Sequence, residues 1–393
     1  MPGRTAEIFL AFLRLGLTSF GGPVAHIGYF RQEFVERRKW LDDRAYADLV
    51  SLCQALPGPA SSQVGIALGL QRGGILGSLA AWLGFTSPSA IALIAFGLLL
   101  SRSPTAMNAA GLHGLKLVAV AVIAQAIWNM GKRLCPDKER ASIAIGGCAL
   151  SLLVPGTTGQ VLVIAAGAAI GFLWLRSDEQ MPHRPFAVRL GRLAGVSMLG
   201  VFAFLLLVLP FAARTFADPA LRLFDSFFRA GALVFGGGHV VLPMLQAEMV
   251  PTGRTDNDIF LAGYGAAQAV PGPLFTFAAY LGAVCNAPPN GLGGALIALI
   301  GIFLPGYLLI VGILPLWDQA RQLSAVSRSM VGVNAAVVGL LLAALYSPVW
   351  SSAVRSAPDF CVAIVAFLLL EVWKVTPWIV VVVCSAVAAL GVG

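Results

Sequence analysis

The sequence predicts an all-α polytopic membrane protein made of two inverted-topology repeats, with broken or re-entrant helices near the membrane midplane. Of its 393 residues, 58% are hydrophobic and only 11% are charged, a composition that soluble globular proteins do not need. The apolar runs recur from end to end, which excludes a soluble domain on a single anchor. Glycine and proline interrupt these runs at matching places in the two halves.

The net charge of +8 falls in short loops between the apolar runs. Such loops are typical of cytoplasmic segments that face anionic lipid. We therefore expect the lipid bilayer, and not nucleic acid, as the partner of this basic chain. The six cysteines form no CxxC pair and are interpreted as small buried hydrophobic residues. The first apolar run is not followed by a small-residue cleavage site, so no cleavable signal peptide is expected.

Five apolar stretches are expected in the first half, at about 8–30, 45–70, 74–100, 107–130 and 141–175. The first is interrupted at Gly21-Gly22-Pro23 and the second at Pro57-Gly58-Pro59. The last is split at 155–159 into two pieces that are short enough for a tight helical hairpin. A polar linker at 176–192 and an extra apolar helix at 193–213 lead into the second half.

The second half repeats the first. Arg14 matches Arg229, Glu33 matches Glu248, and Pro57-Gly58-Pro59 matches Pro271-Gly272-Pro273. Several coincident positions in one order indicate a duplication. The predicted division is an N-terminal repeat at 1–176, a polar linker with the extra membrane helix at 177–217, and a C-terminal repeat at 218–393.

The number of membrane crossings between the repeats is odd whether the broken stretches span the bilayer or re-enter it, so the repeats are inverted. Positive charge favours re-entrant segments, because most loop Lys and Arg residues then share one side. The other side keeps Arg102, Arg214, Arg222, Arg254 and Arg355. This arrangement places the N-terminus in the cytoplasm and the C-terminus outside.

Helices that restart after these interruptions would present free N–H groups and positive dipole ends at membrane depth, which suits an anion. Hydroxyl groups just inside the restarted helices would add donors. The alternative is that the interruptions only kink helices for packing. The residues expected at a substrate site are Gly21, Gly22, Pro57, Gly58, Ser61, Ser62, Gly236, Gly237, Pro271, Gly272 and Thr276.

Three cations lie inside apolar runs, at Arg14, Arg229 and Lys116. Burying an unpaired guanidinium costs several kcal/mol, so each arginine needs a partner, and an oxyanion fits its fork of donors. The alternative is a structural ion pair with Glu7, Asp225 or a helix C-terminus. Lys116 either charges an anion path or extends its ammonium group to the lipid headgroups.

Other polar residues near the interruptions are candidates for the path or for proton coupling. They are Gln54, Gln268, His26, His239, Glu33 and Glu248. Capping of freed carbonyls is the alternative for the glutamines, and a solvated ion pair, such as Glu33 with Arg37, is the alternative for the glutamates. The sequence has no metal-ligand spacing, no nucleophile–base pairing and no P-loop. We therefore expect no cofactor, no metal and no catalytic residues, and the chain is not expected to be an enzyme or an ATP-driven pump.

These motifs resemble the chromate ion transporter family in its long-chain, two-domain form. The resemblance is carried by residues 20–30, Arg37 to Asp42, Gln54 to Gln63, Phe235 to His239 and Gln268 to Pro273. It implies a multi-pass protein of the bacterial inner membrane that exports chromate, confers chromate resistance and uses the proton motive force. Sulfate shares the shape and charge of chromate.

Other functions stay open on the sequence alone. One is a permease for sulfate or another anion, and a second is a membrane-embedded enzyme acting on phosphorylated lipid, which also needs arginines and helix N-termini. A third is a simple anion channel. The oligomeric state also stays open, with a homodimer among the alternatives.

Overall fold

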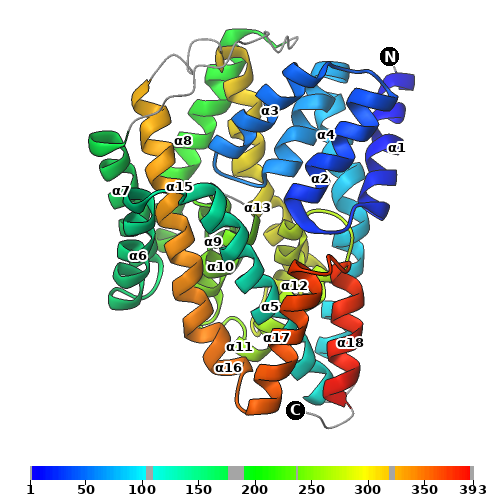
Figure 1. The fold of residues 1–393 in the computed structure, drawn as a ribbon. Coiled ribbons are helices and arrows are strands. Elements are labelled where there is room, and N and C mark those ends of the chain that lie inside the picture. Colours follow the sequence, from blue (N-terminus) through cyan, green and yellow to red (C-terminus); the bar gives the residue numbers. More distant parts are fainter. Residues whose placement is uncertain (1, 103–108, 176–189, 236–237, 318–323, 390–393) are drawn as a thin grey trace.

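The computed structural model describes residues 2–102, 109–175, 190–235, 238–317 and 324–389 and, within them, contains helices and connecting loops but no strands (Figure 1). The first half comprises α1 (Pro2–Thr18), α2 (Gly22–Phe30), a π-helical segment (Arg31–Arg37), α3 (Asp43–Ala55), α4 (Ala60–Arg102), α5 (Ala109–Leu134), α6 (Lys138–Leu153) and α7 (Thr157–Trp174). Helix α8 (Arg192–Thr215) connects it to the second half.

The second half begins with α9 (Pro219–Ala232), a 3-10 turn (Gly238–Val240), α10 (Val241–Met249) and α11 (Asn257–Gln268). A second 3-10 turn (Leu274–Thr276) precedes α12 (Phe277–Ala283) and α13 (Gly291–Ile313). After a third turn (Leu314–Leu316), the chain continues with α15 (Ser324–Ala344), a π-helical segment (Leu345–Trp350), α16 (Ser351–Ala353), α17 (Ala357–Glu371) and α18 (Pro377–Ala389).

The predicted interruptions are breaks between helices. Gly21 has a φ of 99° and caps α2, with Pro23 in the first turn, where a missing N–H has no cost. Helix α4 begins directly after Pro57-Gly58-Pro59 and joins the predicted second and third stretches, with a kink at Gly73 and Gly74. The predicted hairpin at 141–175 is confirmed as α6 and α7, which are separated at Gly156.

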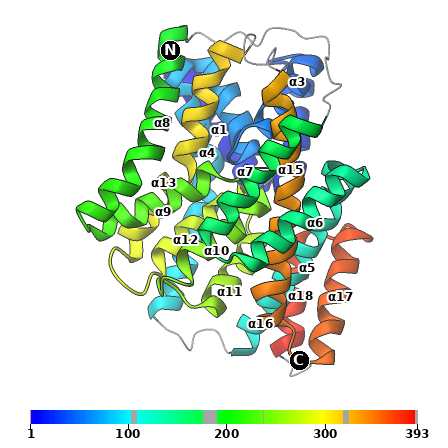
Figure 2. The same cartoon turned by 90° about the vertical axis from the view of Figure 1, so that its left-hand side faces the viewer.

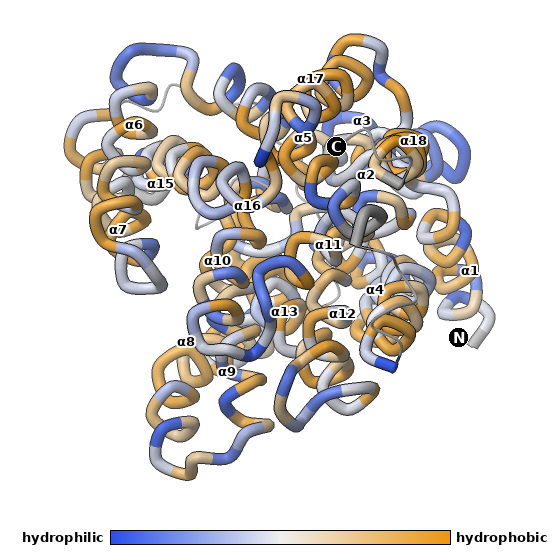
Figure 3. The backbone as a smooth tube through the Cα atoms, turned by 90° about the horizontal axis from the view of Figure 1, so that it is seen from below, coloured by the Kyte–Doolittle hydropathy of each residue, from blue (hydrophilic) through white to orange (hydrophobic). Residues whose placement is uncertain are grey.

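The predicted fold class is confirmed. Six helices in the described part of the chain are long and apolar enough to cross a membrane. Their outward side chains include exposed large hydrophobic residues, such as Leu193, Phe204 and Phe211 on α8. Figure 3 shows hydrophobic residues along the outer helices, whereas hydrophilic residues concentrate in connecting segments. A chain with this surface is an all-α polytopic membrane protein.

The two repeats interleave. Helix α1 packs against α4, and its counterpart α9 packs against α13. The next long helices cross over: α5 packs against α11, α17 and α18 of the second half, while α15 packs against α6 and α7 of the first (Figures 1 and 2). The start of α1 and the end of α18 lie at opposite ends of the molecule (Figure 1).

Candidate functional site

The interruptions of the two repeats meet inside the molecule. The backbone N–H of Gly58 donates to the carbonyl of Val234 over 2.7 Å, and the N–H of Gly272 donates to the carbonyl of Ser19 over 3.0 Å. Ser19 and Val234 each precede the glycine-rich break of their own repeat. Each Pro-Gly-Pro element therefore bonds to the glycine-rich break of the other repeat. We call the contact of Gly272 with Ser19 the first crossing and that of Gly58 with Val234 the second crossing.

Both crossings depend on glycine. Gly58 and Gly272 have φ angles of 119° and 105°, which L-residues with a side chain rarely adopt. A Cβ on Gly272 would lie 2.8 Å from Ser89 Oγ, and a Cβ on Gly58 would lie 3.0 Å from Gly306 Cα. The missing side chains let the backbones approach closely enough for the reciprocal hydrogen bonds.

The first crossing is polar and buried. His26 on α2 lies between two groups, with Nε2 3.2 Å from the carbonyl of Ser19 and Nδ1 3.4 Å from Ser61 Oγ. A carbonyl only accepts, so Nε2 donates, and in the neutral imidazole Nδ1 accepts from Ser61. The ring also meets Phe85 of α4 edge-on at 5.2 Å. His26, Ser19 and Ser61 are each at most 2% exposed.

At the second crossing, the side chain of Gln63 on α4 bridges two backbone segments. Its Nε2 donates to the carbonyls of Pro57 (2.9 Å) and Gly306 (3.3 Å). The capping role considered for Gln54 and Gln268 is therefore filled here by Gln63. His239, which follows the glycine-rich break of the C-terminal repeat, lies near that of the N-terminal repeat: its Nδ1 is 2.8 Å from Tyr264 Oη, and its Nε2 would be 3.9 Å from a Cβ on Gly22.

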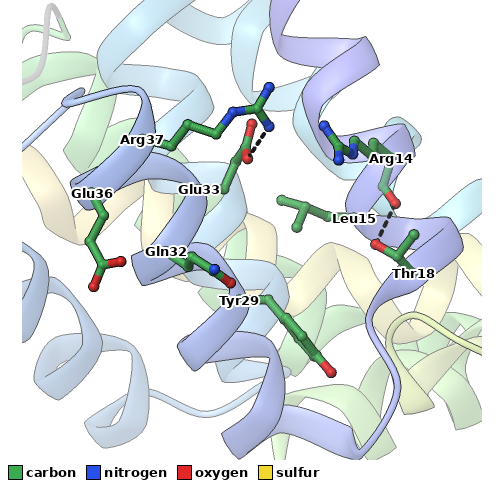
Figure 4. A pocket seen from close by; sticks show the side chains of 8 residues that line it. All are labelled: Arg14, Leu15, Thr18, Tyr29, Gln32, Glu33, Glu36 and Arg37. Atoms are coloured by element: carbon green, nitrogen blue, oxygen red, sulfur yellow. Dashed lines mark hydrogen bonds and ion pairs between the residues drawn. The ribbon is translucent and has the colours of Figure 1, made fainter.

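A pocket of about 570 Å³ opens beside α1, α2 and the π-helical segment (Figure 4). It is lined by Arg14, Leu15, Thr18, Tyr29, Gln32, Glu33, Glu36 and Arg37. The exposed Arg14 guanidinium has no hydrogen bond or ion pair with any described residue, and in Figure 4 it faces the pocket opposite Glu33 and Arg37.

Glu33 in this pocket binds arginines from its own segment. Its carboxylate accepts from Arg38 at 2.5 Å and from Arg37 at 2.8 Å, and Arg38 also reaches Glu7 on α1 at 3.1 Å. Burial opposes ionisation of Glu33, but the hydrogen bonds from Arg38 and Arg37 outweigh it and lower the pKa of the carboxyl. The structure therefore contains the ion pair of Glu33 with Arg37 that was considered from the sequence, together with a second ion pair to Arg38.

A second pocket, of about 510 Å³, occupies the equivalent place in the C-terminal repeat. It is lined by Pro210, Ala213, Arg214, Arg222, Asp225, Ser226, Arg229, Glu248, Thr252 and Arg254. Here the arginine has partners, because Arg229 donates to both carboxylate oxygens of Glu248 (2.8 and 3.1 Å) and to Asp225 (3.0 Å). The structural ion pair considered for Arg229 from the sequence is thus present, and Glu248 joins it. The lining of neither pocket includes the glycine and proline residues of the interruptions.

The other predicted residues are placed as follows. Lys116 is buried and its Nζ lies 3.0 Å from Asp258. Thr276 donates to the carbonyl of Pro273 in its own turn. The buried Oγ of Ser62 and the buried Nε2 of Gln268 have no hydrogen-bond partner among the described residues. Gln54 is half-buried at the end of α3, and Gly236 and Gly237 lie outside the described residues.

Sequence reasoning missed Ser19, Ser89 and Gln63 as members of the crossings. Ser19 and Ser89 carry no motif of their own, and only the pairing of the two repeats brings them to Gly272. Gln63 stands within the Gln54 to Gln63 motif, so its position in that motif was the one available signal.

Paired helix breaks from two repeats, buried in an all-α membrane protein that also has two arginine-containing pockets, define a membrane transporter of the inverted-repeat class. Family comparison agrees: the family model described as Chromate transporter matches residues 6–172 and 221–390. The chain belongs to the chromate transporter family.

Curated relatives carry the same description. A chromate transport protein of Pseudomonas aeruginosa is 29% identical over 397 residues, covering 98% of this chain and 91% of the relative. One of Cupriavidus metallidurans is 29% identical over 352 residues (86% and 81%). A probable chromate transport protein of Synechococcus elongatus is 26% identical over 387 residues (96% and 93%). No solved structure matches the chain significantly.

Proposed function

We propose that this protein is a secondary transporter that exports chromate, or a similar tetrahedral oxyanion, across the bacterial inner membrane. The observation that carries the proposal is the pair of reciprocal hydrogen bonds from Gly58 and Gly272, which gather the interruptions of both repeats at one buried place. Helices α2 and α4 begin there, and helix N-termini favour anions. Family membership supports chromate as the substrate.

The two pockets are proposed as the access routes on either side of the crossings. They occupy equivalent places in inverted repeats, so they would face opposite sides of the membrane. The first contains the unpartnered Arg14 and the second contains four arginines against two carboxylates. An arginine without a counter-ion, and a cleft with an excess of arginines, raise the local concentration of anions. Chromate would then be attracted by Arg14 from the cytoplasm, pass the crossings and leave through the second pocket.

Chromate flux into everted membrane vesicles tests this proposal through Arg14. Arg14→Ala should raise the KM for chromate about tenfold, because it removes the unpaired charge of the pocket, and Arg14→Lys should recover most of the loss. Arg4→Ala on the same helix is the matched control, because Arg4 is exposed but does not line the pocket. Equal flux in Arg14→Ala and the wild type would remove Arg14 from the mechanism.

The same vesicles distinguish the substrate and the energy source. Excess sulfate that abolishes chromate flux would favour a general permease for divalent oxyanions over a chromate exporter. Flux that collapses when an uncoupler dissipates the proton gradient would support coupling to the proton motive force. Flux that follows only the chromate gradient would contradict coupling and favour a channel.

A further inference from the structure

The two crossings have the same backbone geometry but opposite chemistry. The first crossing contains Ser19, His26, Ser61 and Ser89, which are connected by the contacts of His26 and Gly272. The equivalent positions of the C-terminal repeat, in the register set by the matching glycine and proline motifs, are Val234, Val241, Phe275 and Gly306.

The second crossing has few side-chain hydrogen-bond donors that an anion could accept from. Val234, Val241 and Phe275 are at most 1% exposed, and none of their side chains has a hydrogen-bond donor. The amide donor of Gln63 is already used by two backbone carbonyls. The hydroxyl of Thr276 is used by its own turn. The side-chain donors of Gln63 and Thr276 are therefore satisfied within the protein.

The first crossing contains buried hydroxyl groups that make no hydrogen bond with the described residues. Ser19 Oγ is fully buried and has no partner among the described residues. On α4, the same is true of Ser62 Oγ, beside Ser61, and of Thr86 Oγ1, one turn before Ser89. A buried hydroxyl without a partner costs about 1–3 kcal/mol, and three such groups lie on the segments around one histidine, where they are available to a ligand.

The start of helix α2 adds a backbone contribution. Gly22 opens this nine-residue helix three positions after Ser19, and its first N–H groups have no intrahelical partner. The hydrogen-bond and ring contacts of His26 with the described residues are with Ser19, Ser61 and Phe85, none of which is charged. A ligand bound here would therefore be held by neutral donors.

We propose that the first crossing alone is the oxyanion site, and that the second crossing is its closed structural counterpart. This inference rests on the proposed transport of an oxyanion. The unpartnered hydroxyls of Ser19 and Ser62 and the start of α2 supply donors, which suit the four acceptor oxygens of chromate or sulfate. His26, which donates to the Ser19 carbonyl and accepts from Ser61, holds these segments together. A single site predicts that each chain binds one anion, although the helix-break motifs occur twice in the sequence.

Measurements of chromate transport and of chromate binding on the purified full-length protein test whether only the first crossing binds the anion. Chromate uptake into proteoliposomes gives KM, and equilibrium dialysis against chromate in detergent gives Kd. Ser19→Ala should raise both constants roughly tenfold or more, because it removes a hydrogen bond to a charged ligand. Ser61→Ala should raise them as well, because it removes the hydroxyl that fixes the His26 ring. Val234→Ala, at the position equivalent to Ser19, should leave both constants unchanged per folded protein.

The outcomes separate this inference from the proposed function. Binding that depends on Ser19 and Ser61 without any uptake would contradict transport but support the site. Uptake that ignores both serine substitutions, or that is equally sensitive to Val234→Ala, would overturn the site while transport stands. Absence of both binding and uptake in the wild type would overturn both. Dialysis against sulfate shows whether the site accepts tetrahedral dianions in general, and a stoichiometry of two anions per chain would contradict the single site.

Discussion

Arg14 and Arg229 occupy the same position in the two repeats but have different partners. Arg229 is held by Glu248 and Asp225, whereas the Arg14 guanidinium has no ion pair with a described residue, and its equivalent glutamate, Glu33, is bound by Arg37 and Arg38. The competing cations are one cause of the difference, since Arg37 has Thr252 as its counterpart in the other repeat. Several differences between the repeats therefore decide which arginine has partners: Arg37 and Arg38 bind Glu33, and Asp225, which binds Arg229, has Leu10 as its counterpart.

Glu33 should contribute stability that depends on pH. The pKa of its carboxyl is lower in the folded protein than its ordinary value of 4.5, so its contribution is present above about pH 4.5 and is lost as the pH falls through the folded-state pKa. Glu33→Gln should lower the apparent Tm in detergent by roughly 2 °C at pH 7. Wild type and variant should converge towards pH 3, as thermal unfolding across a pH series will show.

Glu36→Gln is the matched control for this series. Glu36 lies in the same segment and lines the same pocket, but its partner Arg31 is half-exposed, and exposed ion pairs contribute little. A Tm difference for Glu33→Gln that stays constant from pH 7 to pH 3 would show that the loss is not electrostatic.

Helix α7 crosses α15 at a contact made of glycines. Gly167 and Gly171 are spaced as in small-xxx-small motifs, which let membrane helices approach closely. A Cβ on Gly171 would lie 2.5 Å from the carbonyl of Arg328 and 2.9 Å from Gly332 Cα. These neighbours are backbone atoms and cannot rotate away, so any side chain at Gly171 must separate the helices.

Gly171→Ala should therefore lower the apparent Tm of the detergent-solubilised protein and its yield. Gly146→Ala on α6 is the control, because a Cβ there meets nothing within 4 Å, and alanine favours a helix over glycine by about 1 kcal/mol. The expected order of Tm is Gly171→Ala below wild type, with Gly146→Ala equal to or slightly above it. The reverse order would contradict the close packing of α7 on α15.

At the scale of the whole molecule, the repeats do not form separate bodies. Helix α15 of the second half packs on α6 and α7 of the first, and α5 of the first half packs on α11, α17 and α18 of the second. The predicted domain boundaries therefore delimit repeats of the sequence, and each hairpin has its main packing partner in the other repeat. Rigid rocking of one repeat as a unit would have to break these contacts.

Cleavage of the polar linker tests the interleaving. A protease site inserted between residues 176 and 189 should give two fragments that still migrate together in native chromatography, because the contacts of α5 and α15 cross between the halves. The cleaved protein should retain chromate uptake in proteoliposomes. Separation of the fragments in mild detergent would contradict an interleaved core.

The amino-acid sequence alone determined the class of protein, the duplication and the positions of the helix breaks. Each of these follows from local properties, such as apolar length, the φ > 0 of glycine and the missing N–H of proline at Gly21-Gly22-Pro23 and Pro57-Gly58-Pro59. Only the tertiary structure decided that each break bonds to the opposite repeat, that Gln63 caps the second crossing and that Arg229 binds Glu248. These pairings join residues that are distant in the chain or have several competing partners. Which partner a group binds depends on how close the folded backbone brings the two groups.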